Sequence, residues 1–254
     1  MRLSIVRAAS LAGMLALPCA PAVAAEFSAA QKAEIGAIVK DYLLANPEVL
    51  RDALAELDIR QKNAEAAARQ KVVSDQSGLL FSSVNQATLG NLKGNATLVE
   101  FFDYNCGYCK RSLDDIARLM KADPNLKVVL KDFPVLGPGS VEAAHVATAL
   151  RNQFKGEKFW DFHQKLLGAR GQVGKAQALA VAKDLGADMD RLEKDMAAPA
   201  IKDSIQEVAL LADQLNLTGT PSFVIGQDVV VGAIPYDEMK LKVDNVHKCG
   251  KVAC

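Results

Sequence analysis

The first part of the chain after residue 25 has the spacing of apolar residues that is typical of helices. Ranges 35–42 and 50–57 each place apolar residues on one helical face, and Asn46-Pro47 between them suits the end of one helix and the start of another. The stretch 58–76 favours helix but is polar nearly all round. Two short helices cannot bury these faces alone. We expect them either to pack on the rest of the chain or, as the polar stretch favours, to associate between subunits.

After Gly78 the hydrophobic period changes from that of helices to that of strands. We predict strands at 79–84 and 96–102, a helix at 107–121 and a buried strand at 126–133. Strand, helix and strand at this spacing form a βαβ unit, so the two strands that flank the helix should be parallel.

Residues 138–216 carry one apolar stripe after another at helical spacing. Strand patterns return at 222–225 and 229–231, and a last helix is predicted at 236–246. The pattern therefore predicts the fold class α/β, with one sheet interrupted by a helical insert at about 138–216.

The composition is that of an ordinary globular protein, with 50% hydrophobic and 24% charged residues among 254. Equal numbers of basic and acidic residues, 30 of each, give little support for nucleic-acid binding. At the start, Arg2 and Arg7 precede the apolar run 8–17, and small residues follow it at 22–25, as in a secretory signal peptide. We expect residues 1–25 to be removed, leaving a net charge of −2, and the protein to be exported to the periplasm.

Four cysteines follow the signal: Cys106 and Cys109 as C-x-x-C, and Cys249 and Cys254 near the end. In an oxidising compartment the simplest arrangement is two local pairs. The C-x-x-C follows an apolar strand and begins a helix, whose N–H groups and dipole stabilise a thiolate. We expect Cys106 to be the exposed nucleophile and Cys109 to resolve the mixed disulfide. A structural disulfide or half of a zinc site remain alternatives.

Thr220-Pro221 opens the strand at 222–225 after a Gly-Thr turn, which makes it a candidate for a cis peptide bond. With the C-x-x-C, it makes residues 79–246 resemble the thioredoxin superfamily, and most closely the exported DsbA-type thiol–disulfide oxidoreductases. These have a helical domain inserted into a thioredoxin fold. The resemblance implies an active-site dithiol at Cys106 and Cys109, beside a cis-proline loop that pairs with substrate as an added strand. The residues expected to contact substrate are Gly107, Tyr108, Thr220 and Pro221.

The resemblance also places the superfamily's buried acidic residue at Glu100, six residues before Cys106. A carboxyl of raised pKa there would carry the proton of Cys109 during resolution. Lys131, in the next predicted strand, is a candidate buried partner for it. A plain charge at a strand edge is the alternative interpretation of Glu100.

Two details within the resemblance favour isomerisation. Oxidase members typically have Pro-His between the cysteines and Val before the cis-proline, whereas this chain has Gly107-Tyr108 and Thr220, similar to the DsbC and DsbG isomerases. Those isomerases oligomerise through an N-terminal segment, and residues 26–76 would supply one. The combination resembles the ScsC proteins of bacterial copper-tolerance systems, some of them trimers, whose membrane reductant ScsB is related to DsbD.

We therefore predict a helical oligomerisation segment and linker at 26–76, then a DsbA-like thioredoxin domain at 77–254. The expected protein is a homotrimeric enzyme that isomerises or reduces incorrect disulfides in exported proteins, with a membrane reductase of the DsbD/ScsB type as partner. No cofactor is expected, because the dithiol carries the electrons.

Two other functions remain open: a dithiol oxidase that introduces disulfides, and a Cu(I)-binding protein that holds copper at Cys106 and Cys109. Cys249 and Cys254 are expected to form a small structural disulfide. The three histidines share no ligand spacing, so no metal site is expected.

Overall fold

The computed structural model describes residues 26–254, and the predicted signal peptide at 1–25 lies outside the described residues. The chain divides into two compact units, Met1–Leu57 and Asp58–Cys254. The sequence pattern placed a boundary at residue 76 instead. The difference arises because Val73, near the C-terminal end of the long helix α2 (Pro47–Asp75), is buried among apolar residues of the second unit.

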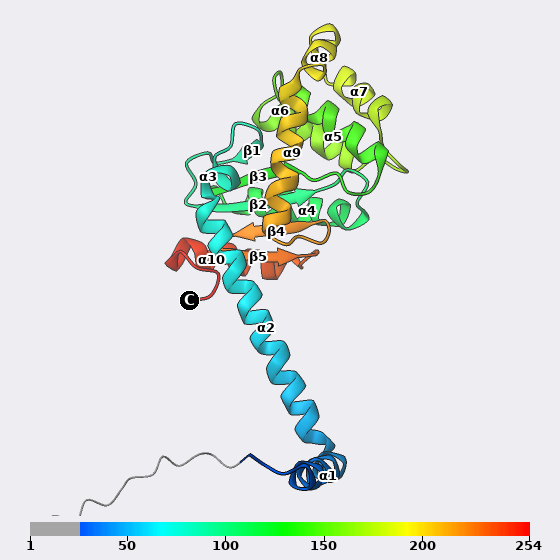
Figure 1. Cartoon of the computed structure of the whole chain (residues 1–254). Helices are drawn as coiled ribbons and strands as arrows, with labels where there is room; N and C mark the ends of the chain where they lie inside the picture. The colour runs from blue at the N-terminus through cyan, green and yellow to red at the C-terminus, as the bar shows by residue number, and fades with distance from the viewer. Residues whose placement is uncertain (1–25) are drawn as a thin grey trace, which may run out of the picture. The chain divides into compact units, whose positions relative to one another are not determined.

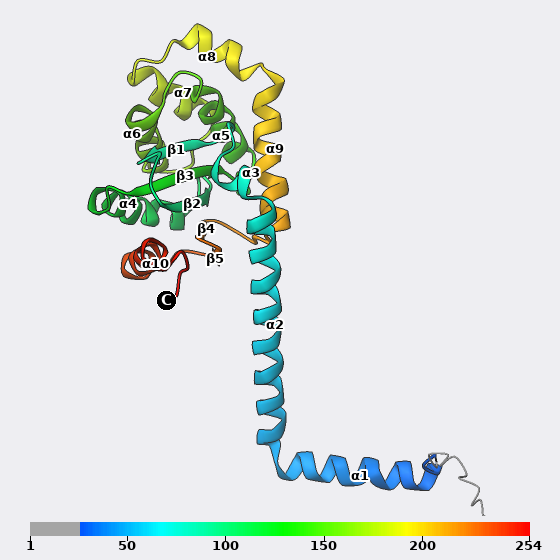
Figure 2. The same cartoon turned by 90° about the vertical axis from the view of Figure 1, so that its left-hand side faces the viewer.

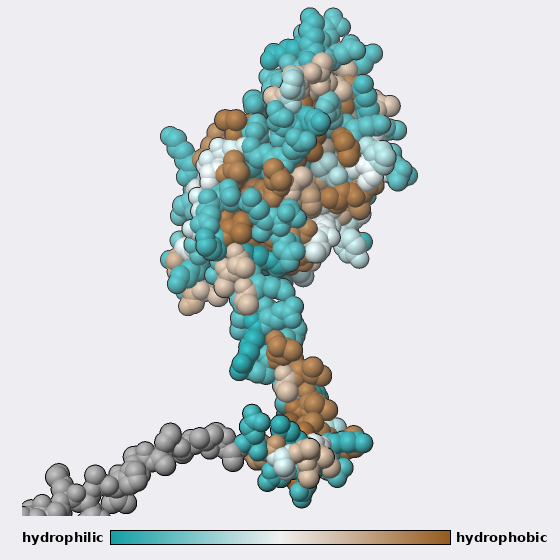
Figure 3. Space-filling model, viewed as in Figure 1, coloured by the Kyte–Doolittle hydropathy of each residue, from teal (hydrophilic) through white to brown (hydrophobic). Residues whose placement is uncertain are grey.

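In the first unit, α1 (Ala29–Ala45) is followed by the first part of α2 (Pro47–Asp75). A capping box starts α1: the Ser28 hydroxyl accepts the N–H of Gln31, whose side chain accepts the N–H of Ser28. No residue of α1 is buried, and Figure 3 shows hydrophobic surface gathered on this part of the chain. The exposed apolar residues of the unit include Ile35, Ile38, Val39, Tyr42, Leu44, Leu50, Leu54 and Leu57.

The second unit contains one five-stranded sheet with strand order β1-β3-β2-β4-β5 (Figure 1). The central strands β2 and β3 are parallel and are joined by α4 (Gly107–Ala122), as the predicted βαβ unit requires; the other neighbouring pairs are antiparallel. The strands are β1 (Ala87–Gly90), β2 (Ala96–Phe102), β3 (Leu126–Asp132), β4 (Ser222–Ile225) and β5 (Asp228–Val231).

Helices cover both faces of this sheet (Figure 2). One face packs on α4 and α10 (Tyr236–Cys249), and the other on α3 (Ser77–Phe81) and α9 (Pro199–Gln214). Side chains alternate along β2. Leu98 and Phe102 therefore join the apolar cluster on the α4 face, whereas Val99 joins the separate cluster on the α9 face.

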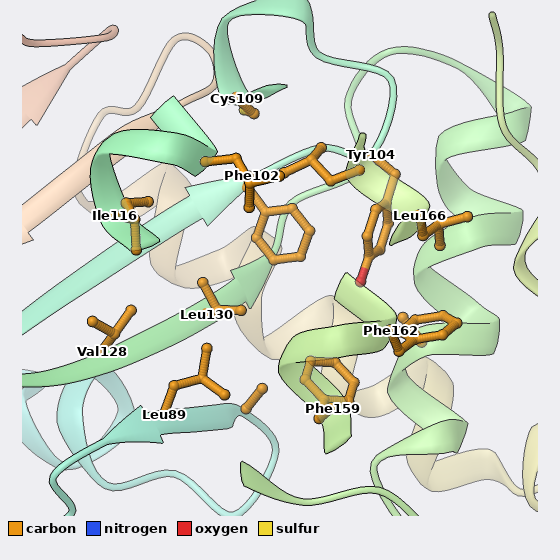
Figure 4. Close-up of a cluster of buried hydrophobic side chains, with 14 of the residues drawn as sticks. Leu89, Phe102, Tyr104, Cys109, Ile116, Val128, Leu130, Phe159, Phe162 and Leu166 are labelled. Atoms are coloured by element: carbon orange, nitrogen blue, oxygen red, sulfur yellow. The ribbon is translucent and has the colours of Figure 1, made fainter. Parts of the chain in front are cut away.

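The helical insert between β3 and β4 extends the cluster on the α4 face. Phe102 and Tyr104 pack edge to face with ring centroids 5.0 Å apart. Figure 4 shows them among buried side chains of α4 and α6, including Ile116 and Phe162. The predicted α/β class with a helical insert is confirmed. The helices of the insert are α5 (Pro138–Leu150), α6 (Gly156–Leu167), α7 (Lys175–Asp184), α8 (Met189–Met196) and α9.

The predicted strand at 79–84 is wrong, because residues 77–81 form the short helix α3 and the edge strand β1 begins only at Ala87. One helical turn buries Leu80 completely against the sheet. It also leaves carbonyl oxygens free at its end, and the Lys131 and Lys127 ammonium groups donate to those of Leu79 and Phe81.

Candidate active site

The C-x-x-C motif lies where the chain turns from β2 into α4. The N–H of Cys106 donates to the carbonyl of Asp103, which closes this turn. Cys106 is the N-cap of α4, and its sulfur accepts the N–H of Cys109 at 3.3 Å. Both cysteines are free thiols. The strand thus delivers Cys106 to a helix N-terminus, where N–H groups stabilise a thiolate.

The loop before β4 lies directly against this motif. The peptide bond between Thr220 and Pro221 is cis, and the Cys106 thiol donates to the Thr220 carbonyl at 3.2 Å. The fold therefore brings together two segments that are more than a hundred residues apart in the sequence. This loop also covers the sulfur: Cys106 is only 4% exposed. The expectation that the Cys106 nucleophile is exposed is therefore wrong. Of the two cysteines, Cys106 is still the more accessible, because Cys109 is completely buried.

Several hydrogen bonds stabilise the Cys106 thiolate. The largest effect comes from the Cys109 thiol, and the Thr220 side chain and the N–H groups of Cys109 and Tyr108 add to it. Burial opposes them, but together they lower the pKa of Cys106 from 9.0 to about 6. The thiolate therefore predominates at neutral pH, and the thiolate is the form that attacks a disulfide.

Cys109 and Glu100 both favour their protonated forms. Burial raises the pKa of Cys109 far above its ordinary value, and the hydrogen bond to Cys106 and the charge of Glu100 act in the same direction. Burial also raises the pKa of Glu100 to about 8, with a smaller contribution from the Cys106 thiolate. Glu100 is 1% exposed, and neither carboxyl oxygen has a hydrogen-bond partner among the described residues. Its protonation state can therefore change without breaking an ion pair.

Lys131 is not the partner of Glu100, and that prediction is wrong. In the parallel pair of β2 and β3, Glu100 lies opposite Leu130, whereas Lys131 lies opposite Phe101. Paired residues point to the same face of a sheet, and neighbours along a strand point to opposite faces. Glu100 therefore lies on the α4 face and Lys131 on the α9 face, where its ammonium group donates to Leu79. Burial lowers the pKa of Lys131 to about 8.

Sequence reasoning missed two residues of the turn before Cys106. The buried Asp103 carboxylate accepts three backbone N–H groups, from Asn105 at 2.7 Å, Val135 at 2.8 Å and Leu136 at 2.9 Å. The side chain of Asn105 binds both backbone groups of Val173 in the insert. Polar residues directly before a C-x-x-C were the available signal. Apart from the bond between Asn105 and Asp103 themselves, however, their partners lie 32 to 68 residues away and have no sequence pattern.

The second cysteine pair forms a disulfide between Cys249 and Cys254, at the end of α10. The helix ends at Gly250, whose φ of 75° is left-handed and favours glycine there. With both sulfurs bonded to each other, this pair supplies no thiolate to a zinc site shared with the C-x-x-C. Among residues 26–254, no group of three or more His, Cys, Asp and Glu side chains is arranged to hold a metal ion.

The site combines a dithiol at a helix N-terminus, a neighbouring cis-proline loop and a buried carboxyl that interacts with the nucleophile. This combination defines a thiol–disulfide oxidoreductase of the thioredoxin fold. The family model described as DSBA-like thioredoxin domain matches residues 97–244, which is more than half of the chain. The chain therefore belongs to the DsbA-like thioredoxin family. A second model, described as copper resistance protein ScsC N-terminal domain, matches residues 31–64. The predicted resemblance to DsbA-type and ScsC proteins is confirmed.

Solved structures and curated relatives agree with this family. A thioredoxin-like oxidoreductase from Silicibacter pomeroyi is 38% identical with a TM-score of 0.64, and the match covers 68% of this chain and 98% of that one. A linker-deletion and point mutant of Proteus mirabilis ScsC is 25% identical with a TM-score of 0.67, and the match covers 89% of this chain and 99% of that one. Disulfide bond formation protein D of Bacillus subtilis is 26% identical over 63% of this chain and 76% of that protein.

Another group of curated relatives is much longer than this chain. The Na(+)/H(+) antiporter NhaA 1 of Salinispora arenicola is 29% identical over 138 residues, which is 54% of this chain and 21% of the antiporter. Within residues 26–254, each helix is too short or too polar to cross a membrane.

Proposed function

We propose that this thiol–disulfide oxidoreductase isomerises or reduces incorrect disulfides in exported proteins. The observation that carries the proposal is the combination of two features in one chain. A stabilised Cys106 thiolate can attack a client disulfide, and a separate helical unit with an uncovered apolar face matches the ScsC N-terminal family. The residues Gly107-Tyr108 and Thr220 add support, because oxidase members typically have Pro-His and Val at these positions.

The first step is attack of the Cys106 thiolate on one sulfur of a client disulfide. A bond forms between Cys106 and that sulfur, and the other client sulfur leaves as a thiolate. A different client thiolate then attacks the mixed disulfide, forms a new pairing and releases Cys106. This sequence exchanges disulfide bonds without net oxidation or reduction, so it needs no further reactant.

In the reductive branch, Cys109 attacks the Cys106 sulfur. The Cys109 thiol must first lose a proton, and Glu100, buried with a pKa of about 8, is the group that we assign to accept it. The new Cys106–Cys109 disulfide releases the client as a thiolate, and two electrons have moved from enzyme to client. A membrane reductase of the DsbD/ScsB type would return them, and no organic cofactor is needed.

Client binding is assigned to the surface around Cys106. Thr220 and Pro221 would pair with an extended client segment as an added strand. Tyr108 is 59% exposed, and the guanidinium of Arg111 lies 4.0 Å from its ring centroid. Tyr108, with Gly107 beside it, therefore offers a flat apolar surface next to the nucleophile.

Residues 26–76 are assigned to subunit association, as a homotrimer. Ile38 and Leu54 are 61% and 65% exposed, and α1 buries no residue. Uncovered apolar stripes of this kind are stable in water when another copy covers them. Association places several dithiols around one client. Export to the periplasm follows from the pattern of residues 1–25, and the copper connection of the ScsC family suits clients whose disulfides copper has scrambled.

The test is refolding of a scrambled multi-disulfide protein by residues 26–254 in a glutathione buffer, with Cys106→Ser as the matched inactive control. Recovery well above that control is expected. Rapid oxidation of a reduced protein without recovery of the scrambled one would assign the chain to the dithiol oxidases. Retention of one Cu(I) per reduced chain, with no acceleration of either reaction, would favour the copper-binding alternative.

A further inference from the structure

The residues on either side of the dithiol hold the same short segment of the helical insert. We call this segment, residues 168–174, the insert loop. The Asn105 side chain accepts the N–H of Val173 at 2.8 Å and donates to its carbonyl at 3.0 Å. On the other side of the motif, the Lys110 ammonium group donates to the carbonyl of Ala169 at 2.7 Å. Both ends of the insert loop are therefore fixed relative to Cys106.

Between its two fixed ends the insert loop presents an exposed tip. Val173 is buried, whereas Arg170, Gly171 and Gln172 are exposed. Gly171 has a φ of 74°, a left-handed conformation that allows the chain to reverse direction between the ends. Within the described part of the chain, Arg170 makes neither a hydrogen bond nor an ion pair. Its charge is available to a ligand.

Arg170 is one of three cationic side chains near the dithiol, which we call the basic rim: Lys110, Arg111 and Arg170. Within residues 26–254, none of the three has a carboxylate within 4 Å. Lys110 binds a carbonyl and Arg111 lies over Tyr108. Of the two buried carboxyl groups beside the dithiol, Asp103 accepts three backbone N–H groups, and Glu100 has a pKa raised to about 8.

Three further acids lie near the rim in the fold. Asp114 and Asp115 lie one helical turn beyond Lys110 and Arg111 on α4, and Glu142 on α5 accepts the N–H of Lys175. Among residues 26–254, none of the three forms an ion pair with the rim.

We propose that Arg170 is a specificity-determining residue that favours client segments with acidic residues beside the disulfide cysteine. This inference rests on the proposed function, because the client is recognised while Cys106 attacks it. An unpaired cation near the nucleophile raises the local concentration of an acidic segment and lowers that of a basic one. Asn105 is a positioning residue here, because its two hydrogen bonds fix one end of the loop that carries Arg170.

The experiment measures single-turnover attack on two short peptides that differ only in charge. Each carries one cysteine as a disulfide with 2-thiopyridine, flanked by two Asp in one peptide and two Lys in the other. The Cys106 thiolate forms a disulfide with the peptide sulfur and expels 2-thiopyridone, whose absorbance reports the rate. The readout is the ratio of the acidic to the basic peptide's rate, taken at low and at high ionic strength.

We expect the wild-type protein to react about fivefold faster with the acidic peptide at low salt, and the ratio to approach one at high salt. Arg170→Glu should bring the ratio to one or below. Lys93→Glu is the matched control: it changes the net charge equally, but Lys93 is exposed in the turn before β2, at the far end of that strand from Cys106. It should keep the wild-type ratio. Asn105→Ala should lower the ratio, with thermal unfolding as the check on its fold.

Equal rates for the two peptides in the wild-type protein, or the same shift in Lys93→Glu as in Arg170→Glu, would overturn the proposal. An Asn105→Ala variant with the wild-type ratio would overturn the positioning role of Asn105. Failure of the proposed function looks different, because then neither peptide would release 2-thiopyridone faster than a Cys106→Ser control.

Discussion

Two helices of nearly equal length show how differently the two units use apolar residues. α1 has 17 residues and buries none of them. α4 has 16 residues and buries five, including Cys109, Leu113 and Ile116. Both were predicted as helices, α1 from apolar residues spaced on one helical face and α4 from its place between two predicted strands. Hydrophobic spacing therefore predicts that a helix has a face to cover, but does not identify what covers it.

The two units also differ in the task assigned to each: thiol chemistry in one and subunit association in the other. The unit Asp58–Cys254 contains its own core on both faces of the sheet and all of the thiol chemistry. The described residues before residue 58, 26–57, contain no cysteine and bury no side chain. We therefore expect that thiol chemistry and subunit association can each be abolished by a substitution that leaves the other intact.

The largest expected effect is that of Cys106→Ser, which removes the nucleophile. Attack on a small disulfide should fall by about a thousandfold or more, because a serine hydroxyl is not ionised at neutral pH. The subunit mass measured by light scattering should stay that of the wild-type protein. If Cys106→Ser retained thiol–disulfide exchange, or changed the subunit number, the assignment of chemistry and association to different units would be wrong.

Leu54→Lys should have the next largest effect, on association. Burying one Leu side chain contributes about 1.5–3 kcal/mol, and in a symmetric assembly this loss recurs in every subunit. We expect the mass to fall to that of one subunit and the recovery of scrambled protein to fall about tenfold. Thiol reactivity should be kept.

Leu210→Lys is the matched control for this substitution, because Leu210 lies on α9 and is 65% exposed, as Leu54 is. It should change neither mass nor recovery. Dissociation in Leu210→Lys, or an intact assembly in Leu54→Lys, would contradict the assignment of the N-terminal helices.

Within the catalytic unit, Glu100→Gln should slow the resolution step about fivefold at neutral pH, because the buried proton acceptor for Cys109 is lost. The rate is measured as release of glutathione from protein that carries it on Cys106. Lys131→Met removes a buried charge from the other face of the sheet and should change this rate less than about twofold. Equal slowing in both variants would indicate general damage to the sheet and not a proton transfer.

The smallest expected effect is the pH dependence of Cys106. With its pKa at about 6, the thiolate fraction and the attack rate should fall about twofold from pH 8 to pH 6. The folded-state pKa lies below the ordinary 9.0, so the thiolate stabilises the reduced protein fully above pH 9, and this stabilisation is lost as pH falls through 6. Absorbance at 240 nm follows the titration. A titration midpoint near 9 would contradict the stabilised Cys106 thiolate. The Leu54→Lys variant should have the same midpoint as the wild-type protein.

Much of the catalytic unit could be predicted from the sequence because its signals are local. The parallel pair around α4 follows from periodicity, and the residues of the Cys106–Cys109 site follow from spacing. The resemblance that placed Glu100 relied on its fixed distance from Cys106.

The rest depends on contacts between distant segments. The pairing register that separates Glu100 from Lys131 is not visible in either strand alone, and a shift of one residue would reverse it. The burial of Cys106 depends on the loop at Thr220, and Asn105 has its partners in the insert. Residues 79–84 contain the apolar run Leu79-Leu80-Phe81 and Val84, which suits a strand, but the carbonyl acceptors for Lys127 and Lys131 favour a helical turn.

The attachment of α2 to α9 has a mechanical consequence. The Arg69 guanidinium donates to the carbonyls of Leu215 and Asn216, where α9 ends. Four residues later the chain reaches Thr220, which contacts the Cys106 sulfur. A pull along α2 would therefore act on the stretch that leads to Thr220, as well as on α3, which follows α2 in the chain. Within the described residues, the helix that carries the dithiol, α4, is not bonded to α2 in this way. If the proposed assembly forms, tension along α2 would reach the loop assigned to client binding through Leu215 and Asn216.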